Sequence, residues 1–385
     1  MTEMVQNDKD IKKCYNSNHI MQTAWKKIIM LTLLALAGAF GLAQTSNAAS
    51  ITVSPPKFEF EAEKGQIISE TIFITNGDAS ELRLESSVAD FTAEGEEGNP
   101  RFTEGDNVSA FSLASWLLIA KEPISIPAGA KVEVPFQVRI PATAEAGGHF
   151  GTIFFSPIDE SGGGVAVKQK VGVLLLVKVK GEIREQGSLD IFNSYNSKVT
   201  ANEVAAAPAQ SFFEKFPINL MVRLTNTGNV HAKPSGKITL KNTFGQTLTR
   251  LGEETVLNPA GAVIGSKLVD YLPVNDRGGN VLPGSSRVFL QTWKGYGSIN
   301  YAPDGKKEIV WKGLGFGCYT AELELAYAGQ NFPKQIIHFW ILPWKIISSV
   351  IAVLIALYFL IKKWNQISRE RLKRQLREEL ERERN

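Results

Sequence analysis

The side chains best suited to acid–base or metal chemistry are few and scattered along the chain. His149, His231 and His338 follow the N-terminal segment, and no histidine stands at a metal-ligand spacing such as HxH or HxxxH. Cys318 has no base beside it in the sequence. The run NDRGGN at 275–280 offers oxygen ligands without the spacing of a calcium loop. These residues therefore favour turns, strand positions and structural histidines over a catalytic or metal site.

Glycine-rich stretches do not predict a phosphate site. SGGGVAV (161–167) and GLGFGC (313–318) each lead into a strand-like run, whereas a loop that cradles phosphate is followed by a helix N-terminus. A GxSxG nucleophile motif is absent from the sequence. We therefore predict that the protein is not an enzyme, with no catalytic, cofactor-binding or metal-binding residues and no cofactor.

Aromatic side chains near predicted loops are better candidates for ligand contact. Trp116 lies in FSLASWLLIAKEP, and Trp293 and Tyr296 lie in QTWKGYGSINY. Exposed Trp and Tyr rings stack on sugars or anchor a protein partner. The alternative is packing in the core, because Trp is highly buried on average.

The charge distribution excludes nucleic acid as a partner. The formal net charge is +3, from 42 Lys and Arg against 39 Asp and Glu. The two ends, residues 1–49 and 362–385, hold 14 of these basic and 8 of these acidic residues. Residues 50–361 therefore carry 28 basic against 31 acidic side chains, a weakly acidic balance. Such a segment lacks the basic footprint of a nucleic-acid-binding protein.

The N-terminal segment reads as a signal peptide, residues 1–49. Lys26 and Lys27 precede the apolar run 28–42, which is short for a membrane span. Small residues follow, and cleavage before or after Ala49 is expected; an uncleaved anchor is the alternative. Cys14 lies in this segment, so Cys318 is the only cysteine of the remaining chain and no intramolecular disulfide is expected there.

The C-terminal segment predicts a transmembrane helix over 341–361. This stretch is apolar apart from Lys345, and Trp340, Trp344 and Trp364 lie where an interfacial aromatic belt would place them. The basic tail 362–385 places the C-terminus in the cytoplasm and the rest of the chain outside, at the cell membrane. The tail is expected to be an amphipathic helix, lying on the inner leaflet, pairing with another helix or simply solvated. A buried core helix over 341–361 is the alternative.

Between the two ends, the apolar residues recur with a period of two. KVEVPFQVRI (131–140) alternates cleanly, and Pro135 on its outward side predicts an edge strand. The turn at 76–78 predicts a hairpin between ISETIFITN and ELRLESSV, and VGVLLLVKVKG (171–181) predicts a central strand. Many short strands bounded by turns predict an all-β protein with two tandem Ig-like β-sandwiches, over 50–182 and 183–336. FITNGDASELRL and RLTNTGNVHAKPSGKITL form a faint internal repeat, which turn chemistry alone could also produce.

These segments, in this order, resemble the WxL-interacting surface proteins of Gram-positive bacteria. ITVSPPKFEFEAEKGQ, ISIPAGAKVEVPFQVRIPATAEAGGHFGTIFF and VGVLLLVKVKG resemble the first Ig-like domain of that family, and VRLTNTGNVHAKPSGKITLKNTFG, VLPGSSRVFLQTW and CYTAELELAYAG resemble the second. The resemblance implies peptidoglycan binding by the first domain and partner binding by the second. No role of an individual residue is carried over, because the shared motifs are strand edges and turns.

We therefore predict a non-catalytic scaffold for adhesion or assembly that is anchored in the membrane and acts at the cell surface. Its expected partners are cell-wall polymer (peptidoglycan), other surface proteins, or both. The alternative is a chaperone-like module that binds strands of secreted or pilus-type subunits.

Overall fold

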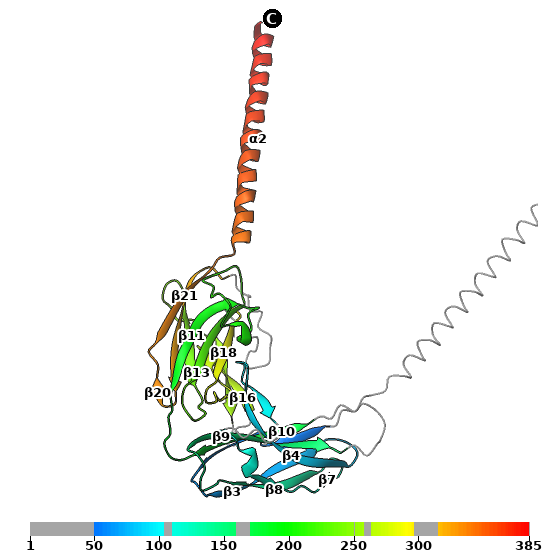
Figure 1. Ribbon diagram of the computed structural model, residues 1–385. Helices are drawn as coiled ribbons and strands as arrows, with labels where there is room; N and C mark the ends of the chain where they lie inside the picture. The colour runs from blue at the N-terminus through cyan, green and yellow to red at the C-terminus, as the bar shows by residue number, and fades with distance from the viewer. Residues whose placement is uncertain are drawn as a thin grey trace, which may run out of the picture. The chain divides into compact units, whose positions relative to one another are not determined.

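The computed structural model describes residues 50–103, 110–158, 170–249, 251–257, 263–295 and 315–384. Strands dominate, and a single apolar helix follows them at the C-terminus of the described residues (Figure 1). The prediction of an all-β fold built from two sandwiches is confirmed. The predicted signal peptide lies outside the described residues.

The first sandwich consists of two facing sheets. One sheet has the strand order β1-β3-β8-β6, and the other has the order β2-β10-β9-β4-β5 with β7 beside β4. The strands are β1 (Ile51–Ser54), β2 (Lys57–Ala62), β3 (Ile67–Asn76), β4 (Leu82–Glu94), β5 (Asn99–Thr103), β6 (Leu117–Ile119), β7 (Ile124–Ile126), β8 (Lys131–Arg139), β9 (Gly147–Pro157) and β10 (Val171–Val179), and the 3-10 turn η1 (Ala114–Trp116) precedes β6.

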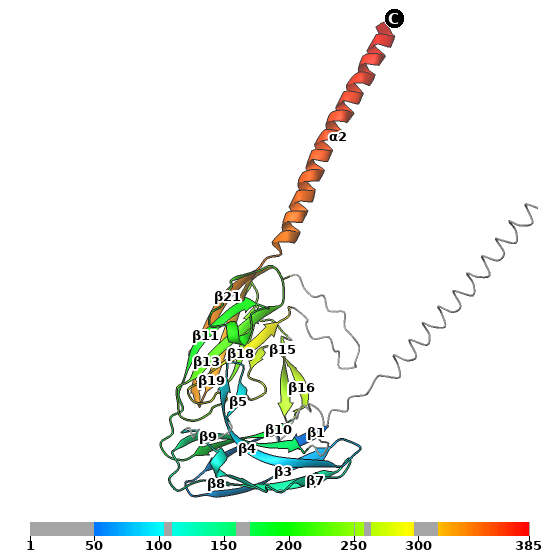
Figure 2. The ribbon, with the colours of Figure 1, turned by 45° about the vertical axis from the view of Figure 1, so that its right-hand side comes forward.

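The second sandwich also has two facing sheets, with a separate two-stranded ribbon. One sheet has the order β11-β13-β18, the other β12-β21-β19-β14-β17 with β20 beside β19, and β15 pairs with β16 (Figure 2). The elements are β11 (Gly187–Asn196), η2 (Ala201–Glu203), β12 (Phe212–Phe213), β13 (Ile218–Asn226), β14 (Ser235–Lys241), β15 (Gly252–Leu257), β16 (Val263–Val269), β17 (Leu272–Val274), β18 (Ser286–Trp293), β19 (Gly317–Tyr327), β20 (Gln330–Asn331) and β21 (Gln335–Ile341).

The two sandwiches repeat one topology. The order β1-β3-β8 in the first corresponds to β11-β13-β18 in the second, and β10-β9-β4 corresponds to β21-β19-β14. In each sandwich a short strand joins the second sheet in parallel, β2 beside β10 and β12 beside β21. Alternating side chains fill a separate core in each unit, with Phe136 and Phe155 in the first and Trp293 and Phe339 in the second.

A buried asparagine ends β3 in the first sandwich and shapes the turn that follows. Asn76 is fully buried. Its Nδ2 donates to the carbonyl oxygens of Ser80 at 2.8 Å and Ile126 at 3.0 Å, and its Oδ1 accepts the main-chain N–H of Asp78 at 2.9 Å. One side chain thus holds the turn and ties it to β7, as buried polar groups require.

Asn226 does the same at the end of β13. Its Nδ2 donates to the carbonyl oxygens of Val230 at 2.8 Å and Val281 at 2.9 Å, and its Oδ1 accepts the N–H of Gly228 at 2.9 Å. The offsets of two and four residues match those around Asn76. The faint repeat in the sequence therefore corresponds to equivalent positions in two copies of one fold.

Two local predictions about strand pairing are wrong. The turn at 76–78 does not close a hairpin, because β3 pairs with β1 and β8 whereas β4 pairs with β5, β7 and β9. Asn76 turns inward instead, and the chain crosses from one sheet to the other. The strand β8 is not an edge, because β6 pairs with it through Phe136 to Val138. Pro135, which lacks an N–H, stands just beyond those paired residues. The strand β10 is central, between β2 and β9, as predicted.

The C-terminal helix α2 (Trp344–Arg384) follows the second sandwich after two residues. The strand β21 extends to Ile341, so the sandwich continues beyond the expected boundary at 336, and the helix begins three residues after the expected start of the span. Residues 344–374 are long and apolar enough to cross a membrane, by length and composition. Lys345 at the start of the helix pairs with Glu214 of the sandwich, Nζ to Oε2 at 2.8 Å.

Candidate functional site

Two of the histidines have structural partners. His149 is buried, with Nδ1 at 3.1 Å from the carbonyl oxygen of Ser112 and Nε2 at 3.0 Å from that of Glu145. His338 is exposed and lies 3.0 Å from the hydroxyl of Thr320. Within the described residues, no group of three His, Cys, Asp or Glu side chains is placed to hold a metal ion.

The three predicted ligand-contact residues differ in their surroundings and in whether the structure describes them. Trp116 is half-buried, and its ring centroid lies 4.3 Å from that of His149. Trp293 has none of its surface exposed and packs against Phe216 and Tyr319. The prediction of an exposed ring at Trp293 is therefore wrong, because this position of β18 faces the core. Tyr296 lies outside the described residues.

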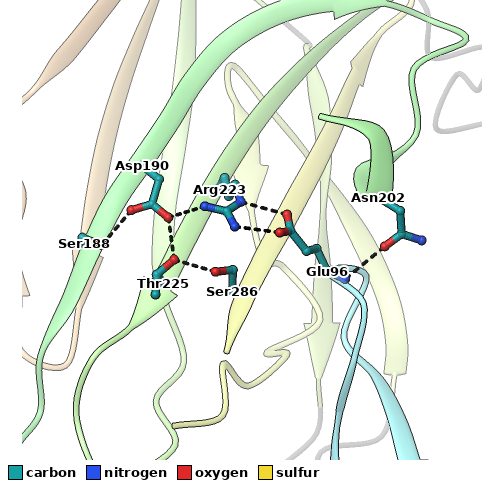
Figure 3. Close-up of polar contacts among 7 residues, drawn as sticks. All are labelled: Glu96, Ser188, Asp190, Asn202, Arg223, Thr225 and Ser286. Atoms are coloured by element: carbon teal, nitrogen blue, oxygen red, sulfur yellow. Dashed lines mark hydrogen bonds and ion pairs between the residues drawn. The ribbon is translucent and has the colours of Figure 1, made fainter. Parts of the chain in front are cut away.

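The most elaborate polar cluster joins the two sandwiches (Figure 3). Glu96, at the tip of the β4–β5 hairpin, accepts two hydrogen bonds from Arg223 of β13, Nε to Oε2 at 2.9 Å and Nη2 to Oε1 at 2.7 Å. Arg223 donates a third bond, from Nη1 to Asp190 of β11 at 2.6 Å. The main chain of Glu96 bonds as well, because its N–H donates to Oδ1 of Asn202 at 3.0 Å and its carbonyl accepts the N–H of Val288 at 2.8 Å. We call these five residues the Glu96 clasp.

The electrostatics of the clasp favour the charged form of Arg223. The side chains of Arg223 and Glu96 are only 21% and 22% exposed, and a two-pronged guanidinium–carboxylate pair is among the stronger polar contacts in proteins. Hydrogen bonding to Glu96 raises the pKa of Arg223 above its ordinary value. The hydroxyl of Thr225 donates to Asp190 and extends the network on the second sandwich (Figure 3).

The β4–β5 turn, residues 95–98, is shaped to deliver Glu96. Gly95 and Gly98 have φ angles of +58° and +84°, in the region that favours glycine. A Cβ at Gly98 would lie 2.1 Å from Cζ of Arg287, so a larger residue there would displace the second sandwich's arginine. The sequence GEEG thus combines a tight turn with an acidic tip.

A second polar contact between the sandwiches centres on Glu59 of β2. Its carboxylate accepts hydrogen bonds from Lys233 and from Asn280, the latter at 2.8 Å, and lies 2.7 Å from Lys57. Burial by itself would raise the pKa of Glu59, but the hydrogen bonds from Lys233, Lys57 and Asn280 outweigh it and lower that pKa to about 2.

The stretch 226–236 also contacts the first sandwich. We call the region formed by this stretch, the Glu96 clasp and the contacts of Glu59 the joint. The carbonyl of Asn229 accepts the N–H of Gly148 at 2.8 Å, and Nδ2 of Asn229 donates to the carbonyl of Glu182 at 2.9 Å. His231 packs edge-on against Phe150, with ring centroids 5.5 Å apart. Its Nδ1 is buried and has no hydrogen-bond partner among the described residues, and burial lowers the pKa of His231 to about 4. This histidine packs within the joint.

A small, mostly apolar cavity of about 170 Å³ lies at the same joint. Its lining includes Phe91, Leu174 and Leu282, together with Arg287. Arg287 donates to the carbonyl of Asn280 at 2.8 Å, and burial lowers its pKa. The cavity is narrow compared with the pockets that hold drug-sized ligands.

Sequence reasoning missed the residues of the joint, although two signals were available. Arg223 is the one charged residue in the strand NLMVRLTN, and Glu96 lies in a glycine-flanked turn. Neither signal identifies its partner, because the two residues are 127 positions apart.

Comparisons with known proteins give only weakly similar solved structures. No protein-family model and no curated protein matches the chain. Similar solved structures include the class 5 fimbriae chaperone CfaA, at 11% identity and a TM-score of 0.32 over 75% of this chain and 99% of that chain. The chaperone–tip adhesion subunit complex from the archaic chaperone-usher Csu pili of Acinetobacter baumannii gives 11% identity and 0.31, over 76% and 98%. The E. coli chaperone DraB gives 11% and 0.29, over 76% and 99%. These values carry no information on what this chain binds.

Proposed function

We propose that the protein is a non-catalytic scaffold, tethered in the cell membrane by α2, that binds other surface proteins outside the membrane. The observation that carries this proposal is the direct continuation of β21 into α2, with only Leu342 and Pro343 between them. A connector of two residues leaves the second sandwich close to the membrane. The Glu96 clasp then ties the first sandwich to the tethered one.

Exposed aromatic side chains support the tether. The end of the second sandwich from which α2 leaves carries large apolar rings that a soluble surface seldom displays together, and that suit a membrane–water interface. They are Phe212, Phe244, Phe316, Trp340 and Trp344, with exposed fractions of 67%, 86%, 67%, 44% and 57%. Lys362 and Lys363 follow the apolar part of α2, and the excess of basic residues beyond it favours a cytoplasmic C-terminus.

Protein partners are favoured over wall polymer. Binding to peptidoglycan by ring stacking would need exposed aromatic faces away from the membrane. Of the candidate rings, Trp293 is buried and Trp116 lies against His149, and the exposed rings named above lie at the end that faces the membrane. The near-neutral balance of residues 50–361 also disfavours capture by bulk charge. Sheet edges and loops are the remaining means of recognition. This is the role that the resemblance to WxL-interacting proteins implies for the second domain.

The test compares the two partner classes directly. Full-length chain in detergent micelles is mixed with purified cell-wall sacculi in one arm and with proteins released from the cell surface in the other. We expect retention of a specific surface protein and no sedimentation with sacculi. Sedimentation with sacculi without retention of any surface protein would replace this proposal with wall anchoring.

The second candidate function is a chaperone-like module that holds a strand of a secreted subunit. Among the described residues, β18 is the last strand of the sheet β11-β13-β18, and this sheet edge favours the candidate. The two functions differ in the lifetime of the complex, because a chaperone releases its subunit to the next partner whereas a scaffold keeps it.

A further inference from the structure

The sheets that contain β8 and β18 differ by one strand. In the first sandwich β8 lies between β3 and β6, whereas in the second β18 is the last strand of β11-β13-β18. Among the described residues, no strand takes the place beside β18 that β6 takes beside β8. The repeated topology therefore leaves one position of the second sandwich open.

The registers show which residues border that position. Counting from Asn76 and Asn226, Thr71 pairs with Pro135 in the first sandwich, and the equivalent Met221 pairs with Leu290 in the second. Two residues further on, Gln137 corresponds to Thr292 by the same count. Gln137 faces Leu118 of β6. Leu290 is thus the counterpart of Pro135, and Thr292 is the counterpart of a residue that has a strand partner.

The main chain of β18 presents its polar groups toward the open side. The N–H of Val288 donates to the carbonyl of Glu96, which lies outside the sheet of β18. Because β18 pairs with β13 without a register shift, alternate residues point the same way. The N–H and C=O groups of Leu290 and Thr292 therefore also point away from β13. Within the part of the chain that the structure describes, no main-chain hydrogen bond to either residue occurs on that side.

The surface beside this edge is hollowed and partly apolar. Leu290 and Thr292 line a groove together with Val199, Pro217 and Asn219. Leu290 is 40% exposed, which is high for a large apolar residue within a strand. An exposed sheet edge with an apolar side chain is a template for another strand.

We propose that the outer edge of β18, at Leu290 and Thr292, is the docking site for an extended segment of a partner protein. The segment adds to the sheet as an antiparallel strand, the direction that β6 takes beside β8. Its main chain bonds the free groups of Leu290 and Thr292, and an apolar side chain covers Leu290. The Glu96 clasp occupies this edge at Val288, so the strand docks along the part of the same edge that runs from Leu290 to Thr292. This inference rests on the proposed function and names the surface that serves it.

The key variants follow from the repeat. Leu290→Pro removes one outward N–H, and the fold should tolerate it because Pro135 already occupies the equivalent position of β8. Thr292→Pro removes the next outward N–H and serves as an independent second variant. Leu290→Thr is the matched control, since it alters the side chain and keeps the donor. Thermal unfolding of each variant checks that the fold is retained.

The probe is a phage-displayed library of random 12-residue peptides, selected on the full-length chain in detergent micelles. We expect selected peptides to alternate apolar and polar residues and to slow amide hydrogen exchange at Leu290 and Thr292. Leu290→Pro and Thr292→Pro should each weaken their binding about ten-fold or more, and Leu290→Thr should weaken it less. Failure to enrich peptides, or binding without protection of these amides and without loss in the proline variants, would overturn the proposal.

Further arms separate this inference from the function on which it rests. If Leu290→Pro chains capture surface proteins on intact cells as well as wild type does, the β18 edge is excluded and the scaffold function stands. If wild-type chains capture none, both fail. If the chain forms dimers that Leu290→Pro abolishes, the occupant is a second copy, and the proposal of a separate partner is overturned.

Discussion

Arg223 of the second sandwich donates two hydrogen bonds to the carboxylate of Glu96 of the first, at 2.9 and 2.7 Å. The pair links segments that are 127 residues apart. Because the same arginine also bonds Asp190, and the Glu96 main chain bonds Asn202 and Val288, one hairpin tip has contacts with three elements of its neighbour. Such a joint links the two sandwiches of a scaffold through side-chain and main-chain hydrogen bonds.

Removing the charge of the clasp should loosen the joint. Glu96→Gln should lower the free energy of unfolding by about 1–3 kcal/mol, because Arg223 stays partly buried with one of its two carboxylate partners lost. Urea denaturation of the full chain in micelles measures this change. The matched control is Glu324→Gln, which breaks the exposed pair with Lys237, at 2.8 Å, and should cause no measurable change. Equal effects of the two variants would show that the clasp stabilises the fold no more than an exposed ion pair does.

His231 should make the folded state sensitive to mild acid. Its pKa is about 4 when folded against an ordinary 6.5, so between these values the unfolded chain binds the proton and the folded chain does not. Stability therefore falls as the pH drops from 6.5 toward 4, by at most about 3 kcal/mol. His231→Phe should flatten this part of a stability–pH profile, whereas His338→Phe, at an exposed position, should leave it unchanged. An unaltered slope in the His231 variant would contradict the assignment.

Glu59 should make the stability of the folded state depend on pH at lower pH than His231 does. Its folded pKa of about 2 lies below the ordinary 4.5, so its contribution is present above pH 4.5 and is lost as the pH falls through 4.5 toward 2. Glu59→Gln should remove this acid-dependent part while leaving the region above pH 5 parallel to wild type. The comparison needs only urea midpoints at several pH values. A Glu59→Gln profile that still falls steeply below pH 4.5 would exclude this residue as the source.

Replacing either of the two turn asparagines should destabilise the fold by a similar amount. Asn76→Ala and Asn226→Ala each leave buried carbonyl oxygens without a donor and should each cost about 2–3 kcal/mol. Asn331→Ala, at an exposed position of β20, serves as the control and should be neutral. A large loss in only one of the two variants would argue against the equivalence of the turns.

Much of the fold was predictable because it depends on local pattern. The period of two along KVEVPFQVRI and the run at VGVLLLVKVKG identified strands, and the charge-free stretch before Lys362 identified the helix. The pairing of β3 was not predictable from the turn at 76–78. A buried Asn76 and an exposed hairpin asparagine have the same sequence signature, and only the distant carbonyl of Ile126 separates them.

The joint was beyond sequence reasoning for a related reason. Glu59 and Lys233 are 174 residues apart, and each reads as an ordinary charged surface position. Trp293 illustrates the opposite error, since a tryptophan next to a glycine-rich loop looked exposed while the alternation of β18 turned it into the core. The open edge of β18 depends on the strand orders of both sandwiches, which the sequence does not show.

The central claim, a membrane-tethered scaffold that binds surface proteins outside the cell, is tested most directly by crosslinking on intact cells. Full-length chain with a C-terminal affinity handle is treated with a membrane-impermeant amine crosslinker, purified under denaturing conditions and analysed by mass spectrometry. We predict crosslinks from lysines of the sandwiches, such as Lys198 and Lys237, to a specific surface protein, and none from lysines of the tail. Crosslinks from the tail with none from the sandwiches, or chains that carry no protein partner at all, would contradict the account.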